Sequence, residues 1–268
     1  MIEKKTTVEL RDLCIGYKTS HSVRCVADHI TANISCGQLT CLLGRNGVGK
    51  STLLRTLSGF QPRLGGNITV MGRPLDDYSD RELARTLGVV LTERPDMQHT
   101  TVFELVAMGR SPYTGFWGRL TSEDKAVTHT AIQQVGINDL SSRQVSTLSD
   151  GERQKVMIAK SLAQQTPIIY LDEPTAFLDY PSKVETLLLL KKLCRESQKT
   201  IFLSTHDMEL ALQVADCLWL MESGGQLHIG KPRQLADEGV LSRFVESAGV
   251  TFDAASLTVR VTNRDYFV

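Results

Sequence analysis

The chain has 268 residues, of which 41% are hydrophobic, so it can build one large α/β domain or two small ones. Its 30 Lys and Arg residues balance 30 Asp and Glu residues, which leaves no broad basic field for nucleic acid, and we expect no nucleic-acid partner. No segment reaches the ~20 apolar residues of a membrane span and none is typical of a signal peptide, so we expect a soluble chain whose membrane role, if any, comes through a partner.

Short strands dominate the first third of the predicted structure. Apolar and polar residues alternate in two stretches near the N-terminus, and an apolar run precedes a glycine-rich segment that a helical pattern follows. The elements predicted up to residue 91 are strands at 7–13, 30–35, 39–43, 67–71 and 88–91 and helices at 52–57 and 79–86.

The pattern becomes helical in the middle of the chain, where two helical stretches flank a loop with Pro, Gly and aromatic residues. Beyond residue 149 helices and strands alternate, which predicts a mainly parallel sheet covered by helices. The elements predicted after residue 100 are helices at 101–108, 122–135, 149–163, 181–195 and 207–214, strands at 168–171, 200–204 and 217–221, and a hairpin turn at Gly224-Gly225.

The cysteines are spaced for neither a metal site nor a redox motif, because none forms a C-x-x-C pair. We expect free thiols in a reducing compartment. The six residues are Cys14, Cys25, Cys36, Cys41, Cys194 and Cys217.

Residues 44–51 match the phosphate-binding pattern G-x-x-x-x-G-K-[ST] between a predicted strand and a predicted helix. Backbone N–H groups of such a loop surround phosphate oxygens, and the helix N-terminus adds positive charge. Lys50 is expected to reach the β- and γ-phosphates and Ser51 to offer its hydroxyl to Mg²⁺. The alternative is a glycine-rich turn that merely ends in Lys-Ser. The predicted ATP-binding residues here are Gly44, Arg45, Asn46, Gly47, Val48, Gly49, Lys50, Ser51 and Thr52.

Two adjacent carboxylates, Asp172 and Glu173, follow an apolar strand. A P-loop enzyme needs an acid at such a strand end to hold the Mg²⁺ shell, and Asp172 fits this role. Glu173 can polarise the attacking water as a general base. The alternative is a helix N-cap followed by an exposed acid.

The sequence Leu148-Ser149-Asp150-Gly151-Glu152 resembles the signature, usually Leu-Ser-Gly-Gly-Gln, of ATP-binding cassette (ABC) ATPases. It can equally form a capping box, with Ser149 as N-cap and Glu152 three residues on, and the two interpretations are compatible. Position favours the signature, because Gly151 precedes Asp172 by 21 residues and one predicted helix joins them.

Three further stretches resemble the same family, two of them after the signature in chain order and one near the N-terminus. Residues 176–179, ending in Asp179, resemble its dimer-contact loop, and residues 204–207 resemble its switch histidine, here His206. Tyr17 resembles the aromatic residue that stacks on adenine. The resemblance covers residues 8–221.

This resemblance implies an α/β P-loop ABC ATPase fold: a mainly parallel sheet, an antiparallel β subdomain and a helical subdomain at about residues 100–165. We expect a single domain over residues 1–268, with a small appendage at about 231–268. In the family two subunits, here expected as a homodimer, sandwich two ATP molecules with Mg²⁺. The resemblance then assigns catalysis to Glu173, His206 and Lys50, and further nucleotide contacts to Tyr17, Ser149, Gly151, Glu152 and Asp179.

The chain departs from the family in two places. Asp150 and Glu152 replace a usual glycine and glutamine and add negative charge near a surface expected to meet phosphate. Glu93 stands where the family usually has a glutamine that touches Mg²⁺, with Gln98 as a possible substitute. The metal site is therefore expected to comprise Ser51, Asp172 and Glu93.

Residues 108–113, 118–120 and 122–124 look like those of ATPases that serve importers of iron siderophores, haem and cobalamin. The resemblance implies an integral membrane permease dimer, a periplasmic or surface binding protein, and a peripheral place on the cytoplasmic face of the inner membrane. The alternatives are a soluble ABC scaffold, as in iron–sulfur assembly, and a slow nucleotide-dependent regulator. We expect the permease to dock at residues 93–117, whose aromatic residues could otherwise form a local core: Phe103, Tyr113, Phe116 and Trp117.

Overall fold

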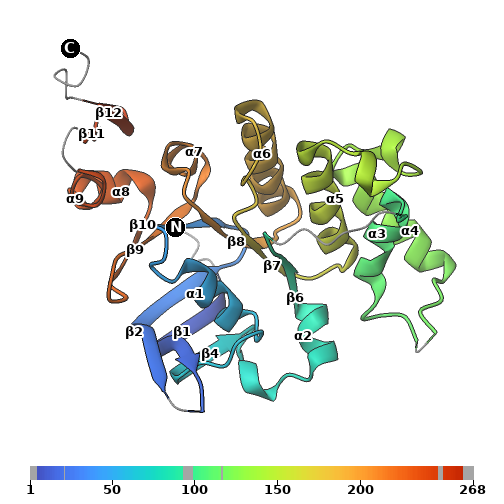
Figure 1. Ribbon diagram of the computed structural model, residues 1–268, viewed down its shortest axis with the longest axis horizontal. Helices are drawn as coiled ribbons and strands as arrows, with labels where there is room; N and C mark the ends of the chain where they lie inside the picture. The colour runs from blue at the N-terminus through green and yellow to red at the C-terminus, as the bar shows by residue number, and fades with distance from the viewer. Residues whose placement is uncertain (1–4, 21, 93–98, 116, 247–249, 262–268) are drawn as a thin grey trace.

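The strands form two large sheets and a small terminal hairpin (Figure 1) in the computed structural model, which describes residues 5–20, 22–92, 99–115, 117–246 and 250–261. The antiparallel sheet has the order β2-β1-β4-β5, and the larger sheet has the order β10-β9-β3-β8-β7-β6. The antiparallel sheet comprises β1 (Thr6–Lys18), β2 (Val23–Ser35), β4 (Gly65–Val70) and β5 (Arg73–Pro74). The larger sheet comprises β3 (Leu39–Gly44), β6 (Leu87–Val90), β7 (Ile168–Asp172), β8 (Thr200–Thr205), β9 (Cys217–Met221) and β10 (Leu227–Gly230).

β1 and β2 are each 13 residues long, about twice the length of the predicted strands at 7–13 and 30–35. The pairing register shifts between Leu10 and Leu13 and again between Leu13 and Ile15, and Asp12 and His29 near these shifts both adopt left-handed backbone (φ 49° and 51°). This irregularity interrupts the alternation of apolar residues but not the pairing. The sequence pattern therefore detected only one half of each strand.

The larger sheet is parallel except at β10, which pairs antiparallel with β9 after the predicted turn at Gly224 and Gly225. Its central strands are buried on both faces, so successive side chains enter different cores. In β3, Cys41 and Leu43 join one core and Leu42 joins the other. The predicted mainly parallel α/β fold is confirmed.

The helices cover the two faces of the larger sheet unequally. α1 packs its leucines into the core shared with the antiparallel sheet, whereas α5, α6 and α7 contribute to the core on the opposite side. In Figure 1, α3, α4 and α5 gather at one end of the molecule, and the C-terminal hairpin lies at the other end. These helices are α1 (Lys50–Leu57), α2 (Asp80–Thr86), α3 (Val102–Ala107), α4 (Ser122–Gln134), α5 (Asp150–Ala163), α6 (Tyr180–Glu196) and α7 (Met208–Val214).

Capping boxes define where four helices begin. In each, a Ser or Thr hydroxyl accepts the N3 backbone N–H, and the N3 carboxylate accepts the N-cap N–H, which satisfies two otherwise orphan donors. The N-cap residues of α2, α3, α4 and α5 are Ser79, Thr101, Thr121 and Ser149. Short 3₁₀ turns lie at Leu75–Asp77, Met108–Arg110, Asn138–Leu140 and Val145–Thr147.

The aromatic residues expected to form a docking surface are partly a local core. Phe103 packs against that core, with its ring centroid 4.9 Å from the His129 ring. The Tyr113 hydroxyl donates to the Gln164 carbonyl oxygen (3.0 Å), and its ring lies 3.9 Å from the Arg110 guanidinium. Trp117 alone of the described three is largely exposed (83%), and Phe116 lies outside the described residues.

A buried ion pair fixes the loop between α3 and α4. The Arg110 guanidinium donates to Asp124 Oδ1 (2.9 Å) and to the Ala163 carbonyl oxygen (2.9 Å), and both charged residues are at least 95% buried. Hydrogen bonds from the Thr121 N–H and hydroxyl, then from Arg110, hold the pKa of Asp124 below its ordinary value.

Arg110→Met is expected to destabilise the fold by about 3–5 kcal/mol at neutral pH, because it leaves the Asp124 carboxylate buried without its cation. A depressed pKa stabilises the fold above the ~3.9 of a free Asp and loses that contribution below it, so the difference should shrink in acid. Urea titrations at several pH values measure both effects. Arg11→Met, which removes the exposed partner of Glu9, is the control and should change little. Equal urea midpoints for wild type and Arg110→Met would contradict the assignment.

The chain after residue 231 forms a small appendage of two helices and a hairpin, α8 (Pro232–Asp237), α9 (Val240–Val245), β11 (Val250–Asp253) and β12 (Thr258–Val261). Phe252 of β11 is buried against the core of the larger sheet. All six cysteines are free, as predicted. Among the described helices, none is long and apolar enough to cross a membrane.

Candidate active site

The glycine-rich loop between β3 and α1 takes a backbone course that requires glycine. Gly47 and Gly49 have φ of 79° and 115°, and a Cβ on Gly49 would lie 2.5 Å from Val26 Cγ1. α1 then begins at Lys50 with no acidic residue in its first turn and no side-chain cap. Its first N–H groups and its dipole are therefore available to an anion.

The Lys50 ammonium lies across this loop. Nζ donates to the carbonyl oxygens of Gly44 (2.9 Å) and Arg45 (3.3 Å), and it lies 3.9 Å from Glu173 Oε1. Lys50 is 6% exposed, so its charge acts in a poorly solvated environment. This charge can attract phosphate oxygens at the mouth of the loop.

Asp172 ends β7 beside the start of α1. The Ser51 hydroxyl donates to Asp172 Oδ1 (3.2 Å), so two of the three predicted metal residues lie together. Within the described ranges, no group of three or more His, Cys, Asp or Glu side chains could hold a metal ion. Ser51 and Asp172 suit Mg²⁺ all the same, because this ion keeps several waters and needs few protein ligands when phosphate supplies others.

Glu173 follows directly and lies between two nitrogen donors. His206, after the end of β8, places Nδ1 2.8 Å from Glu173 Oε2, while Lys50 Nζ lies on the side of Oε1. Glu173 itself has φ of 48°, an uncommon conformation for a residue with a side chain. The turn directs its carboxylate toward the loop, where a water attacking a phosphate would lie.

A cleft beside the loop carries the predicted aromatic residue. Tyr17 is at its wall, and the Tyr17 and Thr52 hydroxyl oxygens lie 2.9 Å apart. Two residues of this cleft, Arg24 and Val26, were not predicted, because only the pairing of β1 with β2 brings Arg24 opposite Tyr17. The described residues that line the cleft are Tyr17, Arg24, Val26, Asn46, Gly47, Gly49, Lys50, Ser51, Thr52 and Glu173.

The ABC transporter family model matches residues 27–176, more than half of the chain, including the loop and both carboxylates. The chain belongs to the ABC transporter family. The ferric enterobactin transport ATP-binding protein FepC of Escherichia coli is 35% identical over 91% of this chain and 88% of its own length. The achromobactin transport ATP-binding protein CbrD of Dickeya dadantii is 35% identical over 88% of this chain and 86% of its own.

Solved structures agree with this membership. The cassette cbiO1 of Clostridium perfringens, part of the ABC transporter complex cbiONQ, is 29% identical with a TM-score of 0.76, over 90% of this chain and 94% of its own. The ABC cassette MJ0796, in a post-hydrolysis state with ADP and Pi, is 25% identical and has a TM-score of 0.72. The match covers 84% of this chain and 98% of MJ0796. The chain binds and hydrolyses ATP as an ABC-type ATPase.

Residues 149–152 begin α5 as a capping box, which confirms that interpretation, while their interpretation as an ABC signature remains a prediction. The Ser149 N–H and hydroxyl donate to Glu152 Oε2 (2.8 and 2.9 Å), which lowers the pKa of Glu152. A Cβ on Gly151 would lie 3.0 Å from Ser182 Oγ of α6, so glycine allows close packing there. None of these three residues is among the described residues that line the cleft beside the glycine-rich loop.

The loop between β7 and α6 also has a structural role in the single chain. Asp179 caps α6 by accepting the Ser182 N–H (3.0 Å), and Phe177 presents an aromatic ring that is 73% exposed. The ABC contact assigned to Asp179 is a contact with a second subunit, which a single chain does not contain. Its assignment, like those of Ser149, Gly151 and Glu152, remains a prediction.

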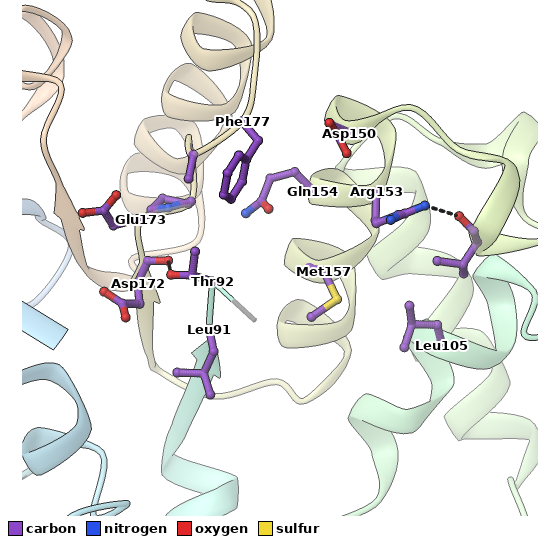
Figure 2. A pocket seen from close by; sticks show the side chains of 13 residues that line it. Leu91, Thr92, Leu105, Asp150, Arg153, Gln154, Met157, Asp172, Glu173 and Phe177 are labelled. Atoms are coloured by element: carbon purple, nitrogen blue, oxygen red, sulfur yellow. Dashed lines mark hydrogen bonds between the residues drawn. The ribbon is translucent and has the colours of Figure 1, made fainter. Parts of the chain in front are cut away.

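Figure 2 shows the cleft between the end of β7 and α5, where Gln154 and Met157 of α5 point toward the strand end that carries Thr92. The carboxylates of Asp172 and Glu173 point away from α5, and Arg153 turns toward the Val145 carbonyl oxygen, to which it donates (3.3 Å). The Thr92 hydroxyl donates to the Asp172 carbonyl oxygen (2.8 Å), which ties the strand end of β6 to that of β7. The chain then continues into residues 93–98. Glu93, the predicted metal ligand, and its alternative Gln98 lie outside the described residues.

Proposed function

We propose that this ATPase drives import of an iron chelate, such as a siderophore or haem, or of a cobalamin-like ligand, through a partner membrane permease. The names of its relatives carry the proposal: achromobactin, ferric enterobactin and iron(3+)-hydroxamate transport proteins match over 88–96% of this chain. A cobalamin import protein of Halobacterium salinarum is 34% identical, although the match covers 59% of that longer protein. No comparable observation favours a soluble scaffold or a slow regulator.

ATP would lie along the loop with its adenine against Tyr17 and its phosphates at the N-terminus of α1. Ser51 and Asp172 would hold Mg²⁺, which supplies charge neutralisation for the phosphoryl group. The hydroxyl–carboxylate pair at 3.2 Å supports this assignment. Lys50 would orient the terminal phosphate, and the loop N–H groups would bind its oxygens.

Glu173 would take the proton of the attacking water as the general base. His206, 2.8 Å from one carboxylate oxygen, would hold that carboxylate in place and respond to the terminal phosphate. The opposite oxygen faces Lys50, so the base would be oriented from both sides. Proton transfer then needs only a water on the cleft side of Glu173.

The active unit would be a homodimer with two ATP molecules at its interface. Ser149, Gly151 and Glu152 of one subunit, together with Asp179, would complete the nucleotide site of the other. Their absence from the described lining of the cleft within one chain supports a contribution from a second copy. The dimer would lie on the cytoplasmic face of the inner membrane, bound peripherally to a permease dimer. A periplasmic or surface binding protein would deliver the ligand to that permease.

A groove bordered by the end of α1, by α2 and by residues 108–112 is a better candidate for the permease docking surface than the aromatic loop alone. Phe60 and Met108, which are 62% and 45% exposed, line this groove together with Leu83. Exposed apolar side chains of this kind typically meet a protein partner. We therefore propose that a short apolar segment of the permease occupies this groove.

Met108→Glu is expected to abolish most ligand transport while the purified soluble subunit keeps its basal ATPase rate, because the groove lies apart from the described nucleotide cleft. Transport into cells or proteoliposomes and phosphate release measure the two quantities. Trp117→Glu is the comparison, since Trp117 is exposed but does not line the groove. Loss of transport in Trp117→Glu alone would move the docking surface to the loop.

Co-purification from solubilised membranes tests the proposed function directly. An affinity-tagged chain should retain an integral membrane permease, and vesicles holding that complex should accumulate a ferric siderophore, haem or cobalamin only with ATP. Recovery of the chain without any membrane protein, together with normal ATPase turnover, would instead support the scaffold alternative. Turnover near zero in every preparation would favour the regulator.

A further inference from the structure

Ser204 lies beside both carboxylates of the hydrolytic site. It is the fifth residue of β8 and is opposite Asp172 in the parallel register of β7 and β8. Its side chain has no exposed surface. A buried hydroxyl at this position must find its hydrogen-bond partners inside the protein.

The Ser204 hydroxyl joins two groups of the neighbouring strand end. Oγ donates to Asp172 Oδ1 (2.6 Å) and accepts the backbone N–H of Glu173 (3.0 Å). A hydroxyl has one hydrogen to give, and here the carboxylate takes it, so the oxygen lone pairs remain for the Glu173 N–H. The short distance to Asp172 is typical of a charge-assisted bond.

These two bonds act on the orientation of the reacting groups. Asp172 Oδ1 accepts from both Ser51 and Ser204, which leaves Oδ2 for the metal shell. Glu173 has φ of 48°, a strained conformation that persists only when its surroundings hold it. The bond from its N–H to Ser204 Oγ is such a constraint, and it holds the backbone of the same residue whose carboxylate contacts His206.

We propose that Ser204 is a positioning residue for ATP hydrolysis, whose single hydroxyl fixes the metal-binding acid Asp172 and the strained backbone of the base Glu173 relative to each other. The inference rests on the proposed roles of those two carboxylates. Ser204 itself is fully buried and is not among the described residues that line the cleft. Its effect should therefore appear in the rate of hydrolysis and not in the recognition of adenine or ribose.

Ser204→Val and Ser204→Thr form a matched pair, because the two side chains have nearly the same shape and only threonine keeps the hydroxyl. We expect kcat to fall about 10-fold or more in Ser204→Val, since small displacements of reacting groups cost this much. Ser204→Thr should recover most of that loss, and KM for ATP should change little in either. Ser204→Ala, which adds no methyl group to a fully buried site, serves if the larger side chains impair folding.

Binding of a fluorescent ATP analogue, titrated with and without Mg²⁺, gives a readout besides turnover. Each variant should bind the analogue with nearly wild-type affinity without the metal. The variants lacking the hydroxyl should need more Mg²⁺ for its effect on binding, because Asp172 is less fixed. Unchanged kcat in both Ser204→Ala and Ser204→Val, or equal loss in Ser204→Thr and Ser204→Val, would overturn the proposal.

Combining Ser204→Ala with Glu173→Gln separates this proposal from the roles on which it rests. If Ser204 acts through Glu173, the double variant should turn over no more slowly than Glu173→Gln alone. Additive losses would show that Ser204 does not act through Glu173 and would overturn its proposed role toward the base. Near-normal turnover of Glu173→Gln would refute the proposed base, whatever Ser204→Ala does.

Discussion

Glu173→Gln is expected to lower ATP turnover by at least ~10²-fold while ATP binding is retained. The amide keeps the shape of the side chain and can still bond to His206, 2.8 Å away in the wild type, but it cannot accept the proton of the attacking water. Phosphate release under saturating ATP gives the turnover, and titration with a fluorescent nucleotide gives the affinity. Glu222→Gln is a matched control, because Glu222 also lies near a histidine (His228, 3.5 Å) but outside the site.

The same variant should accumulate an ATP-bound dimer, since binding would bring two subunits together and hydrolysis could no longer separate them. Light scattering of Glu173→Gln should give twice the monomer mass with ATP and the monomer mass without it. A variant that stays monomeric with ATP yet has lost turnover would support Glu173 as the general base and contradict the ATP-bridged dimer. Near-normal turnover would remove Glu173 from the mechanism.

The parts of the site that the sequence could predict are those made by contiguous residues. The loop from Gly44 to Ser51 and the pair Asp172-Glu173 each bring their chemistry in one short segment with a strand before it. The structure adds that the two segments meet, since the Ser51 hydroxyl donates to Asp172. Local sequence patterns are reliable here because backbone geometry, not tertiary packing, determines where the functional groups point.

The residues that the sequence could not predict depend on register between strands. Ser204 contacts Asp172 because β7 and β8 pair in parallel at those two positions, and Arg24 lies opposite Tyr17 because β1 and β2 pair after a register shift. Neither relation leaves a signal in the order of residues. Serine and arginine at such positions are otherwise typical of many solvent-exposed strand ends.

The aromatic residues of the helical region were predicted, from their number alone, to form a docking surface for the permease. Phe103 is partly buried against the core and the Tyr113 ring packs on Arg110, so both side chains make contacts within the chain, as the alternative of a local core predicts. The position of the Tyr113 ring is explained by Arg110, because a buried guanidinium that is already paired with a carboxylate is further stabilised by the face of an aromatic ring. The number of aromatic residues in a loop cannot by itself distinguish packing from docking.

Lys50→Ala is expected to weaken ATP binding by about 10- to 100-fold, because the loss of a hydrogen bond to a charged group typically costs about 1.5–3 kcal/mol. The substitution removes the buried charge facing the phosphates and also two bonds to loop carbonyl oxygens, those of Gly44 and Arg45. Isothermal titration with ATP measures the affinity. Lys191→Ala is the control, because Lys191 is also largely buried and paired, with Asp216 (2.6 Å), but does not line the cleft.

His206→Ala should give the complementary result, with affinity largely kept and turnover lowered, because the His206 imidazole hydrogen-bonds to the base Glu173. The two variants together test whether charge at the loop binds the nucleotide and whether the imidazole orients the base. Unchanged ATP affinity in Lys50→Ala with lost affinity in His206→Ala would reverse the two assignments. If both variants lost affinity equally, binding and orientation of the base would be one coupled function, and Lys50, 3.9 Å from Glu173 Oε1, would be the residue that couples them.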